Sequence, residues 1–539
     1  MNPRSESHRD VEERDPLRLV LSIGAGVTLP EEASPASLGF KAWNLARMAA
    51  MGLPVPAAFV IGTGWCGREA PDPCLWQQAL QRLERESGLG FGDARRPLLL
   101  SVRSGAPVSM PGMMDTLLDI GLTEVTLPGL VRLTGNPRLA WDAYRRLIAG
   151  YGEVVAGIDG RHFEADLDAV RGDGDEHELD FAALRDIAKR HLATYAREAG
   201  EAFPQDPQVQ LRAAVVAVFA SWYGDKARAY RELHELPASP GTAVTVQRMV
   251  FGNAGGMSGA GVGFTRDPSS GEPSPWVDFL FNAQGEDVVS GRRRAQSHEE
   301  LAAVAPQIWE ALLKTMTQLE QGFGDMQDFE FTVQDGQLYL LQTRDGKRTP
   351  QAAARIALDL CDQGLIPRRI ALERTRGLDA RALAVRRLVS EAGRTVEPLA
   401  RATSAAGGVV CGEIALDEAR VRARKEAGAS VLLVRRDAET RDLPALHLAD
   451  GLLTQRGART SHAAVVARQL GKVCLVGCDS LTIDEADRSL SIGGLALREG
   501  DPLTLDGNEG VLYAGAARMG EQVAQDLLER LERLRHEPH

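Results

Sequence analysis

Apolar and polar positions follow two different rhythms along the chain, and together they predict strands mixed with helices. Short apolar runs such as RPLLLSVRSG (96–105) and AVTVQRMVFG (243–252) are typical of buried strands. The wider apolar spacing in HELDFAALRDIAKRHLATYAREAG (177–200) instead predicts a helix. We therefore expect an α/β (α+β multidomain) fold.

Breaks in these patterns divide the chain into segments. Pro and Gly replace the helical pattern at Glu397–Gly408, which predicts a hinge before a last region of short strands and helices. Near the C-terminus the apolar spacing predicts one amphipathic helix, with Val523, Leu527, Leu528, Leu531 and Leu534 on its apolar face. The expected segments are a disordered tail (1–18), a nucleotide-binding domain (19–345) with a helical subdomain (about 120–235), a helical linker (346–403), a small β/α domain (404–515) and the C-terminal helix (516–539).

Composition narrows the class of protein. A chain of 539 residues is too long for one hydrophobic core. Its formal net charge of −12 argues against nucleic acid or an anionic membrane as a partner, because both attract basic surfaces. The six cysteines form no CxxC pair, and the chain shows neither a signal peptide nor an apolar run long enough for a membrane span. We expect a cytoplasmic protein.

A glycine-rich segment is the first candidate for chemistry. The sequence FGNAGGMSGAGVGFTRDP (251–268) contains six glycines, and such density lets backbone N–H groups turn towards an anion. The spacing is not that of a Walker A loop, because no GK[ST] follows. A flexible surface loop explains the segment almost equally well, so the glycines alone leave both interpretations open.

The segment DMQDFEFTVQDGQLYLLQTRDGKR (325–348) predicts a β-hairpin around Gln334–Asp335–Gly336. We expect a three-residue loop, with Gly336 left-handed as a G1 bulge, and reject a two-residue loop because it would split the polar residues across both faces. The expected pairs are Val333 with Gln337, Glu330 with Leu340, and Asp328 with Gln342. This register places Asp328, Glu330, Gln342 and Arg344 on one face, with Phe329, Phe331, Val333, Tyr339 and Leu341 on the core face.

The polar face of this hairpin suits a metal-bound phosphate. Asp328 and Glu330 are two apart on a strand and can share a hard ion such as Mg²⁺. Arg344 beside them would neutralise phosphate charge. A solvated face with an incidental ion pair is the plainer alternative. Two basic residues upstream, Lys41 and Arg103, would by themselves pass for ordinary surface charges.

The most specific signal is GARTSHAAVVARQLGKVCLVG (457–477). His462 directly precedes a predicted helix, Ala463–Leu470, with Thr460 and Ser461 as potential N-caps. A phosphate on this imidazole would lie at the helix N-terminus, where free N–H groups and the helix dipole favour an anion. An imidazole with a pKa near 6.5 is largely neutral at pH 7 and available as a nucleophile. A capped helix with an exposed histidine is the alternative.

Several segments between Leu38 and Ala514 resemble the pyruvate phosphate dikinase family, more closely than phosphoenolpyruvate synthase. They occur in the same order as in that family and include SVRSGAPVSMPGMMDT, TGNPRLAWDAYRRLI, VQRMVFGN, NAQGEDVVSGRR, DMQDFEFT, LQTRDGKRT and TSHAAVVAR. The resemblance implies an ATP-grasp-type nucleotide-binding domain followed by a swivelling β/β/α domain that carries a phosphohistidine.

The resemblance also assigns roles by motif match. His462 would be phosphorylated in a setting of Gly457, Thr460 and Ser461, Arg344 and Arg103 would assist catalysis, and Asp328 and Glu330 would hold Mg²⁺. The residues expected to bind ATP are Lys41, Arg103, Gln247, Met249, Gly255, Gly256, Ser258, Gly259, Glu330, Gln342 and Arg344. In such enzymes ATP and inorganic phosphate yield AMP, pyrophosphate and phosphohistidine, and the phosphate then passes to pyruvate to form phosphoenolpyruvate.

The sequence departs from the family's pattern in three respects. Met257 and Ala260 replace threonines of the glycine segment, which removes two hydroxyl donors. Ala458 and Arg459 stand where Gly and Met are usual, and Arg459 would add a cation beside the bound phosphate. Only about two dozen residues follow LTLDGNEGVLYAG, whereas a (β/α)₈ barrel needs about 250. We therefore expect a separate barrel protein, onto which the C-terminal helix could dock, and a possible homodimer.

Two other functions stay open. The donor and carrier domains could serve a different acceptor, as in rifampicin phosphotransferases and glucan water dikinases, although 346–407 looks short for an antibiotic-binding domain and no carbohydrate-binding aromatic cluster is visible. The chain could also be a non-catalytic regulatory remnant, which Met257, Ala260 and the missing barrel would favour. The presence of every expected charged residue argues against a remnant.

Overall fold

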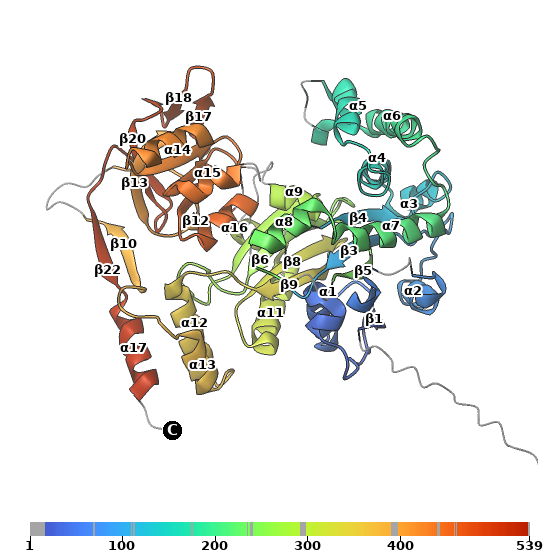
Figure 1. Ribbon diagram of the computed structural model, residues 1–539, viewed down its shortest axis with the longest axis horizontal. Helices are drawn as coiled ribbons and strands as arrows, with labels where there is room; N and C mark the ends of the chain where they lie inside the picture. Colours follow the sequence, from blue (N-terminus) through green and yellow to red (C-terminus); the bar gives the residue numbers. More distant parts are fainter. Residues whose placement is uncertain are drawn as a thin grey trace, which may run out of the picture. The chain divides into compact units, whose positions relative to one another are not determined.

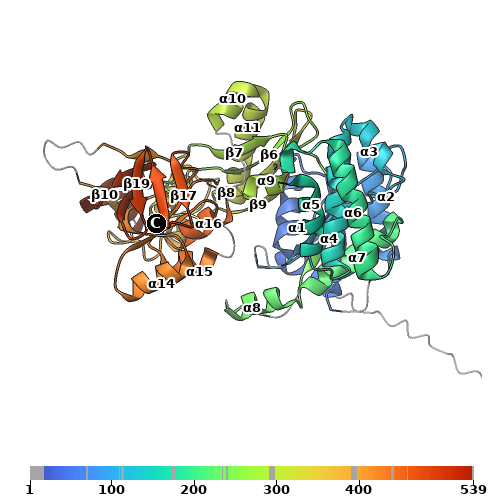
Figure 2. The same ribbon diagram turned by 90° about the horizontal axis from the view of Figure 1, so that it is seen from above.

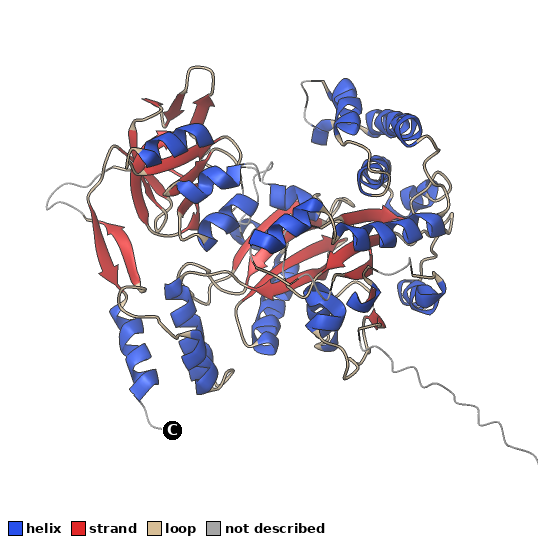
Figure 3. Cartoon of the chain, in the orientation of Figure 1, coloured by secondary structure: helices blue, strands red, loops and turns tan. Residues whose placement is uncertain are grey.

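The computed structural model describes residues 17–67, 71–108, 110, 114–172, 174, 176–233, 235–237, 241–290, 298–389, 397–438, 442–457, 459 and 461–536. The chain forms two compact units, Met1–Val250 and Phe251–His539, so the nucleotide-binding segment expected at 19–345 is divided between them. Helices and strands are mixed in both units, which confirms the expected α/β class (Figures 1 and 3). No helix in the described part of the chain is long and apolar enough to cross a membrane.

The first unit is built on a five-stranded antiparallel sheet with the order β1-β2-β5-β3-β4. Its strands are β1 (Val20–Ile23), β2 (Ala58–Ile61), β3 (Leu100–Gly105), β4 (Thr116–Ile120) and β5 (Ala243–Arg248). The sequence AVTVQR of β5 is buried along almost its whole length, as the continuous apolar run predicted. Two helices, α1 (Pro35–Ala50) and α2 (Cys74–Ser87), pack on this sheet.

Six further helices of this unit lie between β4 and β5. They are α3 (Leu127–Thr134), α4 (Pro137–Val154), α5 (Arg161–Arg171), α6 (Phe181–Ala199), α7 (Pro207–Ser221) and α8 (Asp225–Leu233). Polar N-caps begin the longest of them, since Asn136, Asp180 and Asp206 each accept a hydrogen bond from a backbone N–H of the first turn. Helix α4 packs on α6 and α7 (Figure 2).

The second unit begins with a four-stranded antiparallel sheet of order β7-β6-β8-β9, called here the β6–β9 sheet. Its strands are β6 (Gly259–Phe264), β7 (Trp276–Phe281), β8 (Gln327–Gln334) and β9 (Gln337–Asp345), and the helices α9 (Gly285–Ser290), α10 (His298–Val304) and α11 (Pro306–Phe323) pack on it. Gly259, Gly261 and Gly263 alternate along β6 on the face that holds phenylalanine rings. A Cβ on Gly261 would lie 2.3 Å from the Phe331 ring, so packing requires the glycine.

The hairpin β8–β9 corrects the predicted turn. Gln334 pairs with Gln337 across a two-residue turn in which Asp335 and Gly336 both have positive φ, whereas we expected three residues. The polar face nevertheless forms, because the register shifts at a bulge after Glu330 and brings Asp328 opposite Arg344. On the core face, Leu338 and Leu340 take the places that we had assigned to Tyr339 and Leu341.

A helical base follows the hairpin, with α12 (Pro350–Asp362) and α13 (Arg368–Arg374) joined by the C-terminal helix α17 (Gln525–His536). Leu527, Leu531 and Leu534 of α17 are buried in one apolar cluster with α12 and α13. This apolar face of the helix is therefore covered by the chain itself, whereas we had expected that it could dock onto a separate barrel protein. The predicted C-terminal helix also starts too early, because Met519–Val523 forms strand β22.

Strand β22 pairs with β10 (Ala384–Leu388) in an antiparallel two-stranded ribbon, so the linker expected to be helical at 346–403 ends partly in strands. The ribbon joins the helical base to the last domain (Figure 1). Both the entry to that domain and the exit from it therefore run through neighbouring strands.

The last domain, called here the eight-stranded domain, has the strand order β11-β21-β20-β13-β14-β15-β16-β12 and parallel pairing from β13 to β16. Apolar clusters fill both faces of its sheet. The strands of this sheet are β11 (Ala400–Arg401), β12 (Thr403–Ala406), β13 (Val409–Ala415), β14 (Val431–Arg435), β15 (Gly451–Thr454), β16 (Val473–Val476), β20 (Pro502–Asp506) and β21 (Val511–Ala514), and the helices of the domain are α14 (Glu418–Glu426), α15 (Leu443–Leu448) and α16 (His462–Gln469). The strands β17 (Leu481–Asp484), β18 (Ser489–Ile492) and β19 (Leu495–Arg498) form a separate three-stranded sheet.

Candidate functional site

Four polar residues meet on one face of the β8–β9 hairpin. Asp328 lies opposite Arg344 and Glu330 lies opposite Gln342, in rows of the ladder that are two apart and therefore share a face. The Arg344 Nε donates to Asp328 Oδ2 at 2.7 Å, and Gln342 Nε2 donates to Glu330 Oε1 at 3.3 Å. The hairpin thus brings together all four side chains that the sequence placed on one face.

The charges of this face are interdependent. Asp328 is only 4% exposed, and its burial raises the pKa of the carboxyl, with Arg344 opposing the shift and Glu330 adding to it. Burial works against the charge on Arg344, but the Asp328 and Glu330 carboxylates outweigh it and raise the pKa of the guanidinium. A further cation bound beside Asp328 would therefore stabilise the charged form of its buried carboxylate, as expected of a Mg²⁺ ligand.

The fit to Mg²⁺ rests on these two carboxylates. No group of three or more His, Cys, Asp and Glu side chains gathers at metal-binding distance within the described ranges. Mg²⁺ needs no such cage, because it retains waters and takes one or two carboxylates together with phosphate oxygens. Asp328 and Glu330, two residues apart on the same face, match that donor set.

The glycine segment has two parts with different roles. Gly255 and Gly256 have φ values of 91° and 55° in a loop, and nothing lies within 4 Å of a Cβ built on either. Backbone there is free to approach an anion. Ser258 and Gly259 are buried, and the Ser258 Oγ accepts a 3.0 Å bond from the Asp335 N–H. Ser258 thus contacts the hairpin turn, and Gly259 pairs with Val333 of β8.

The other expected ATP-binding residues belong to the first unit. Arg103 of β3 and Gln247 of β5 lie on the same face of the five-stranded sheet, two rows of the ladder apart in register. Gln247 is buried, and its Nε2 donates to the Pro56 carbonyl at 3.0 Å. Lys41 on α1 lies beside the end of β3, because its Cβ is 3.7 Å from the place where a Gly105 Cβ would stand. Met249 follows β5, and its N–H donates to Leu99 O.

The candidate carrier residue, His462, is the first residue of α16. Ser461 is the N-cap, and its Oγ accepts from the Ala464 N–H at 3.4 Å. Gly457 has a φ of 126°, which favours glycine, and turns the chain into the loop that leads to this helix. Thr460, the other predicted cap, lies outside the described residues, as does Ala458.

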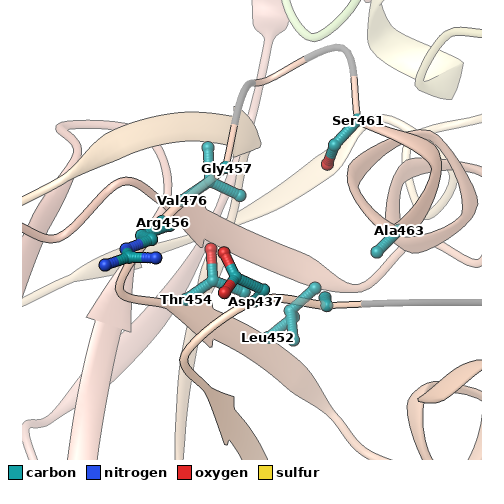
Figure 4. Close-up of a pocket in the computed structure, with 9 residues that line it drawn as sticks. Asp437, Leu452, Thr454, Arg456, Gly457, Ser461, Ala463 and Val476 are labelled. Atoms are coloured by element: carbon teal, nitrogen blue, oxygen red, sulfur yellow. The ribbon is translucent and has the colours of Figure 1, made fainter. Parts of the chain in front are cut away.

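A small pocket is lined by Gly457, by Ser461 and by Ala463 of α16 (Figure 4). Its lining includes Asp437, Thr454, Arg456, Gly457 and Ser461, which come from β15 and the loops beside it. The Thr454 Oγ1 is buried and has no hydrogen-bond partner among the described residues. The buried hydroxyl of Thr454, which has no hydrogen-bond partner among the described residues, therefore lines the same pocket as Ser461, the N-cap of α16.

The structure corrects the expected role of Arg459 and reveals residues that the sequence did not single out. The Arg459 guanidinium contacts Asp278 and Trp276 of β7, so it is engaged by the β6–β9 sheet instead of being reserved for phosphate. Arg468 of α16 lies over Phe264 and Trp276. The alternation in WVDFLF places Trp276 and Asp278 on one face, but nothing in the sequence indicates what contacts them.

Two protein families match the chain. Residues 68–299 and 295–364 match the pyruvate phosphate dikinase AMP/ATP-binding domain. Residues 428–510 match the mobile domain of PEP-utilising enzymes, and this range includes His462 and all of α16.

Curated relatives align with most of the chain. A pyruvate, phosphate dikinase from Clostridium symbiosum is 42% identical over 507 residues, covering 92% of this chain and 58% of the relative. One from Rhizobium meliloti (strain 1021) is 42% identical over 531 residues, covering 93% and 58%, and pyruvate, phosphate dikinase 2 from Zea mays is 40% identical over 508 residues, covering 92% and 57%. The chain thus spans a little over half the length of the relatives that it matches.

Proposed function

The chain belongs to the pyruvate phosphate dikinase family, and from that premise we propose that it is a phosphotransferase that moves phosphate from ATP onto His462. The His462 imidazole attacks the β-phosphorus of ATP, the bond between that phosphorus and the α–β bridging oxygen breaks, and AMP leaves. The outer phosphate then passes to inorganic phosphate as pyrophosphate, and the inner phosphate stays on the imidazole. Transfer to pyruvate would form phosphoenolpyruvate.

One observation carries this proposal. The face of the β6–β9 sheet that presents Asp328 is contacted by Arg468, which belongs to the helix beginning at His462. Phe264, under the Arg468 guanidinium, is the direct neighbour of Asp328 in the register. Phosphoryl transfer needs a nucleophile close to a charge-neutralising site, and this packing supports that arrangement.

The residues of the hairpin would divide the work. Asp328 and Glu330 would hold Mg²⁺, which when bound neutralises phosphate charge. Gln342 orients Glu330, and Arg344 keeps the buried Asp328 ionised and supplies a guanidinium for the transferring group. The ATP-binding roles proposed for Lys41, Arg103, Gln247 and Met249, with the last two on the adenine side, rest on family membership. Gly255 and Gly256 would offer backbone N–H groups to the triphosphate.

Labelling with β-³²P-ATP, Mg²⁺ and phosphate tests the proposal. We expect acid-labile, base-stable label on the protein and phosphate-dependent release of AMP and pyrophosphate. His462→Ala should abolish the label, whereas His447→Ala, an exposed histidine on α15, should leave it unchanged. Absence of label from the unaltered protein would contradict the proposal.

The second half of the reaction requires an acceptor for the phosphate. The matched relatives are longer chains, and they lend no support to a barrel that a second polypeptide would provide. The burial of α17 against the chain's own helices likewise removes the surface that we had expected to dock such a partner. Pyruvate as acceptor therefore rests on family membership, and a labelled protein that loses its phosphate on addition of pyruvate would support it.

A further inference from the structure

Arg459 makes three contacts with one strand of the β6–β9 sheet. Its Nε donates to Asp278 Oδ1 at 3.0 Å, its Nη2 donates to the Val277 carbonyl at 3.2 Å, and its guanidinium carbon lies 4.6 Å from the Trp276 ring centroid. The side chain of Arg459 is only 15% exposed and that of Asp278 only 7%. A guanidinium desolvated against an aromatic ring and a carboxylate is held much more firmly than one at the surface.

Arg468 secures the same contact from within the eight-stranded domain. Its Nε and Nη2 donate to the Ala405 carbonyl at 2.9 and 2.6 Å, and its Nη2 also donates to the Arg459 carbonyl at 3.2 Å. Its guanidinium lies 4.6 Å from the Trp276 centroid and 5.2 Å from that of Phe264. Burial lowers the pKa of Arg468 to about 10, which leaves it charged at neutral pH.

The register of the sheet connects this contact to the candidate active site. Trp276, Phe264, Asp328 and Arg344 follow one another across β7, β6, β8 and β9, and the next row on the same face, two residues along each strand, is Asp278, Val262, Glu330 and Gln342. The two side chains that Arg459 contacts, those of Trp276 and Asp278, thus begin the two rows that end in the polar face. The loop preceding His462 is fastened to the edge of the sheet that presents the metal and phosphate residues.

We propose that Arg459 is a positioning residue, which holds the loop before His462 against β7 and so keeps the eight-stranded domain docked on the β6–β9 sheet. This inference rests on the proposed function, because docking matters for catalysis only if His462 is the phosphorylated group. Asp278 and Trp276 are its partners, and Arg468 braces its backbone.

A disulfide can report the docked state directly. A Cβ built on Gly407 of the eight-stranded domain lies 3.8 Å from the Ser269 Cβ, which is the mean Cβ separation of disulfides. Gly407 has no positive φ, and its nearest neighbour, Asn508 Oδ1 at 3.2 Å, need move only slightly. In Ser269→Cys/Gly407→Cys protein, the rate of disulfide formation then measures how much of the population is docked.

Arg459→Met in this background removes the charge and keeps an unbranched side chain. We expect the rate of disulfide formation to fall about tenfold. Asp278→Asn should lower this rate by a similar factor, and the double variant Arg459→Met/Asp278→Asn should lower it no further than either single change. Arg459→Lys should fall between, because it keeps the charge without the planar group. Arg422→Met, an exposed arginine of α14, is the matched control. Unchanged cross-linking of Arg459→Met would overturn the proposal.

Labelling of His462 provides the second readout. Arg459→Met should slow labelling by a factor similar to that for cross-linking, and oxidation to the disulfide should restore it, because the cross-link replaces the lost contact. Slow labelling that the disulfide fails to rescue would overturn a positioning role. If the unaltered protein takes no label while Arg459→Met still slows cross-linking, the proposed function fails, and with it the role of Arg459 in phosphorylation, although the docking contact stands.

Discussion

Asp328 and Arg344 lie directly opposite each other in the β8–β9 ladder, and the Arg344 Nε donates to the Asp328 Oδ2 at 2.7 Å. Only 5% of the Asp328 side chain is exposed, against 31% of the Arg344 side chain. The arginine therefore neutralises the charge of a carboxylate that is largely shielded from solvent. Substitution of the two partners should then change the free energy of unfolding by different amounts.

Arg344→Met should destabilise the second unit more than Asp328→Asn does. The first change leaves a buried carboxylate without its cation, which costs about 3 kcal/mol of unfolding free energy, whereas the second leaves a partly solvated arginine and a neutral acceptor, at about 1 kcal/mol. Urea unfolding of the two variants measures both values. Arg190→Met, which breaks an exposed pair with Asp186, should have no measurable effect. Equal losses for the two hairpin variants would contradict this account of the pair.

Gly261→Ala tests why β6 is rich in glycine. The added Cβ would lie 2.3 Å from the Phe331 ring and 2.8 Å from the Asp278 carbonyl, so we expect a loss of about 2 kcal/mol in unfolding free energy from overpacking. Gly150→Ala in α4 is the control, because nothing lies within 4 Å of that Cβ and alanine favours a helix by about 1 kcal/mol. Thermal unfolding should therefore move in opposite directions for the two alanines.

The double variant Gly261→Ala/Phe331→Leu sharpens the test. Leucine removes the ring atoms that the new methyl group meets, so part of the loss should be recovered relative to the sum of the single changes. Strict additivity would show that the glycine is needed for some reason other than the Phe331 ring.

The hairpin shows what the pattern of residues could and could not predict. Alternation placed Asp328 and Glu330 on the polar face, because side chains of a strand alternate whatever turn follows. Asp335–Gly336 is the common pair for a two-residue turn, and we rejected that turn because we assumed a regular ladder. The bulge after Glu330 removes the conflict, and nothing local in the sequence indicates a bulge there.

Roles that depend on distant contacts were not predictable. The six glycines of 251–268 look alike in the sequence, but Gly259 packs against the Phe279 ring while Gly255 faces open space. Likewise, the side chain of Arg459 bonds to the carboxylate of Asp278, which lies 181 residues earlier in the chain. From its position near His462 we had expected it to bind phosphate, because the sequence does not show that Asp278 is its partner. Local patterns predicted strands and caps, and only packing could distinguish these roles.

His191 should make the stability of the first unit depend on pH. Burial lowers the pKa of its imidazole and Arg145 lowers it further, while the Arg145 and Phe163 carbonyls, at 3.1 and 3.2 Å from the two ring nitrogens, and the Asp166 carboxylate oppose the shift. A pKa below the ordinary 6.5 means that the unfolded chain binds the extra proton first. Stability is therefore complete above about pH 6.5 and falls on acidification, by at most about 1.4 kcal/mol per pH unit.

Comparison with His191→Gln isolates this contribution. Glutamine does not titrate, so the advantage of the unaltered protein in urea unfolding should shrink between pH 7.5 and pH 5.5. A growing advantage at low pH would mean that the ring is a cation that donates to both carbonyls, the reverse of the expected sign.

Arg266 and Arg530 share the carboxylate of Asp359, and they should differ sharply in importance. Arg266, two residues after the end of β6, is 2% exposed and donates to both Glu320 and Asp359, which ties the sheet to α11 and α12. Arg266→Met leaves two carboxylates around an apolar side chain, and we expect a loss of about 3 kcal/mol in unfolding free energy.

Arg530 joins α17 to α12 from a side chain that is 23% exposed. Arg530→Met should cost less than about 1 kcal/mol, because solvent replaces its bonds and Asp359 keeps Arg266. Urea unfolding that shows the larger loss for Arg530→Met would mean that the C-terminal helix is held by this ion pair and not by the burial of Leu527 and Leu531.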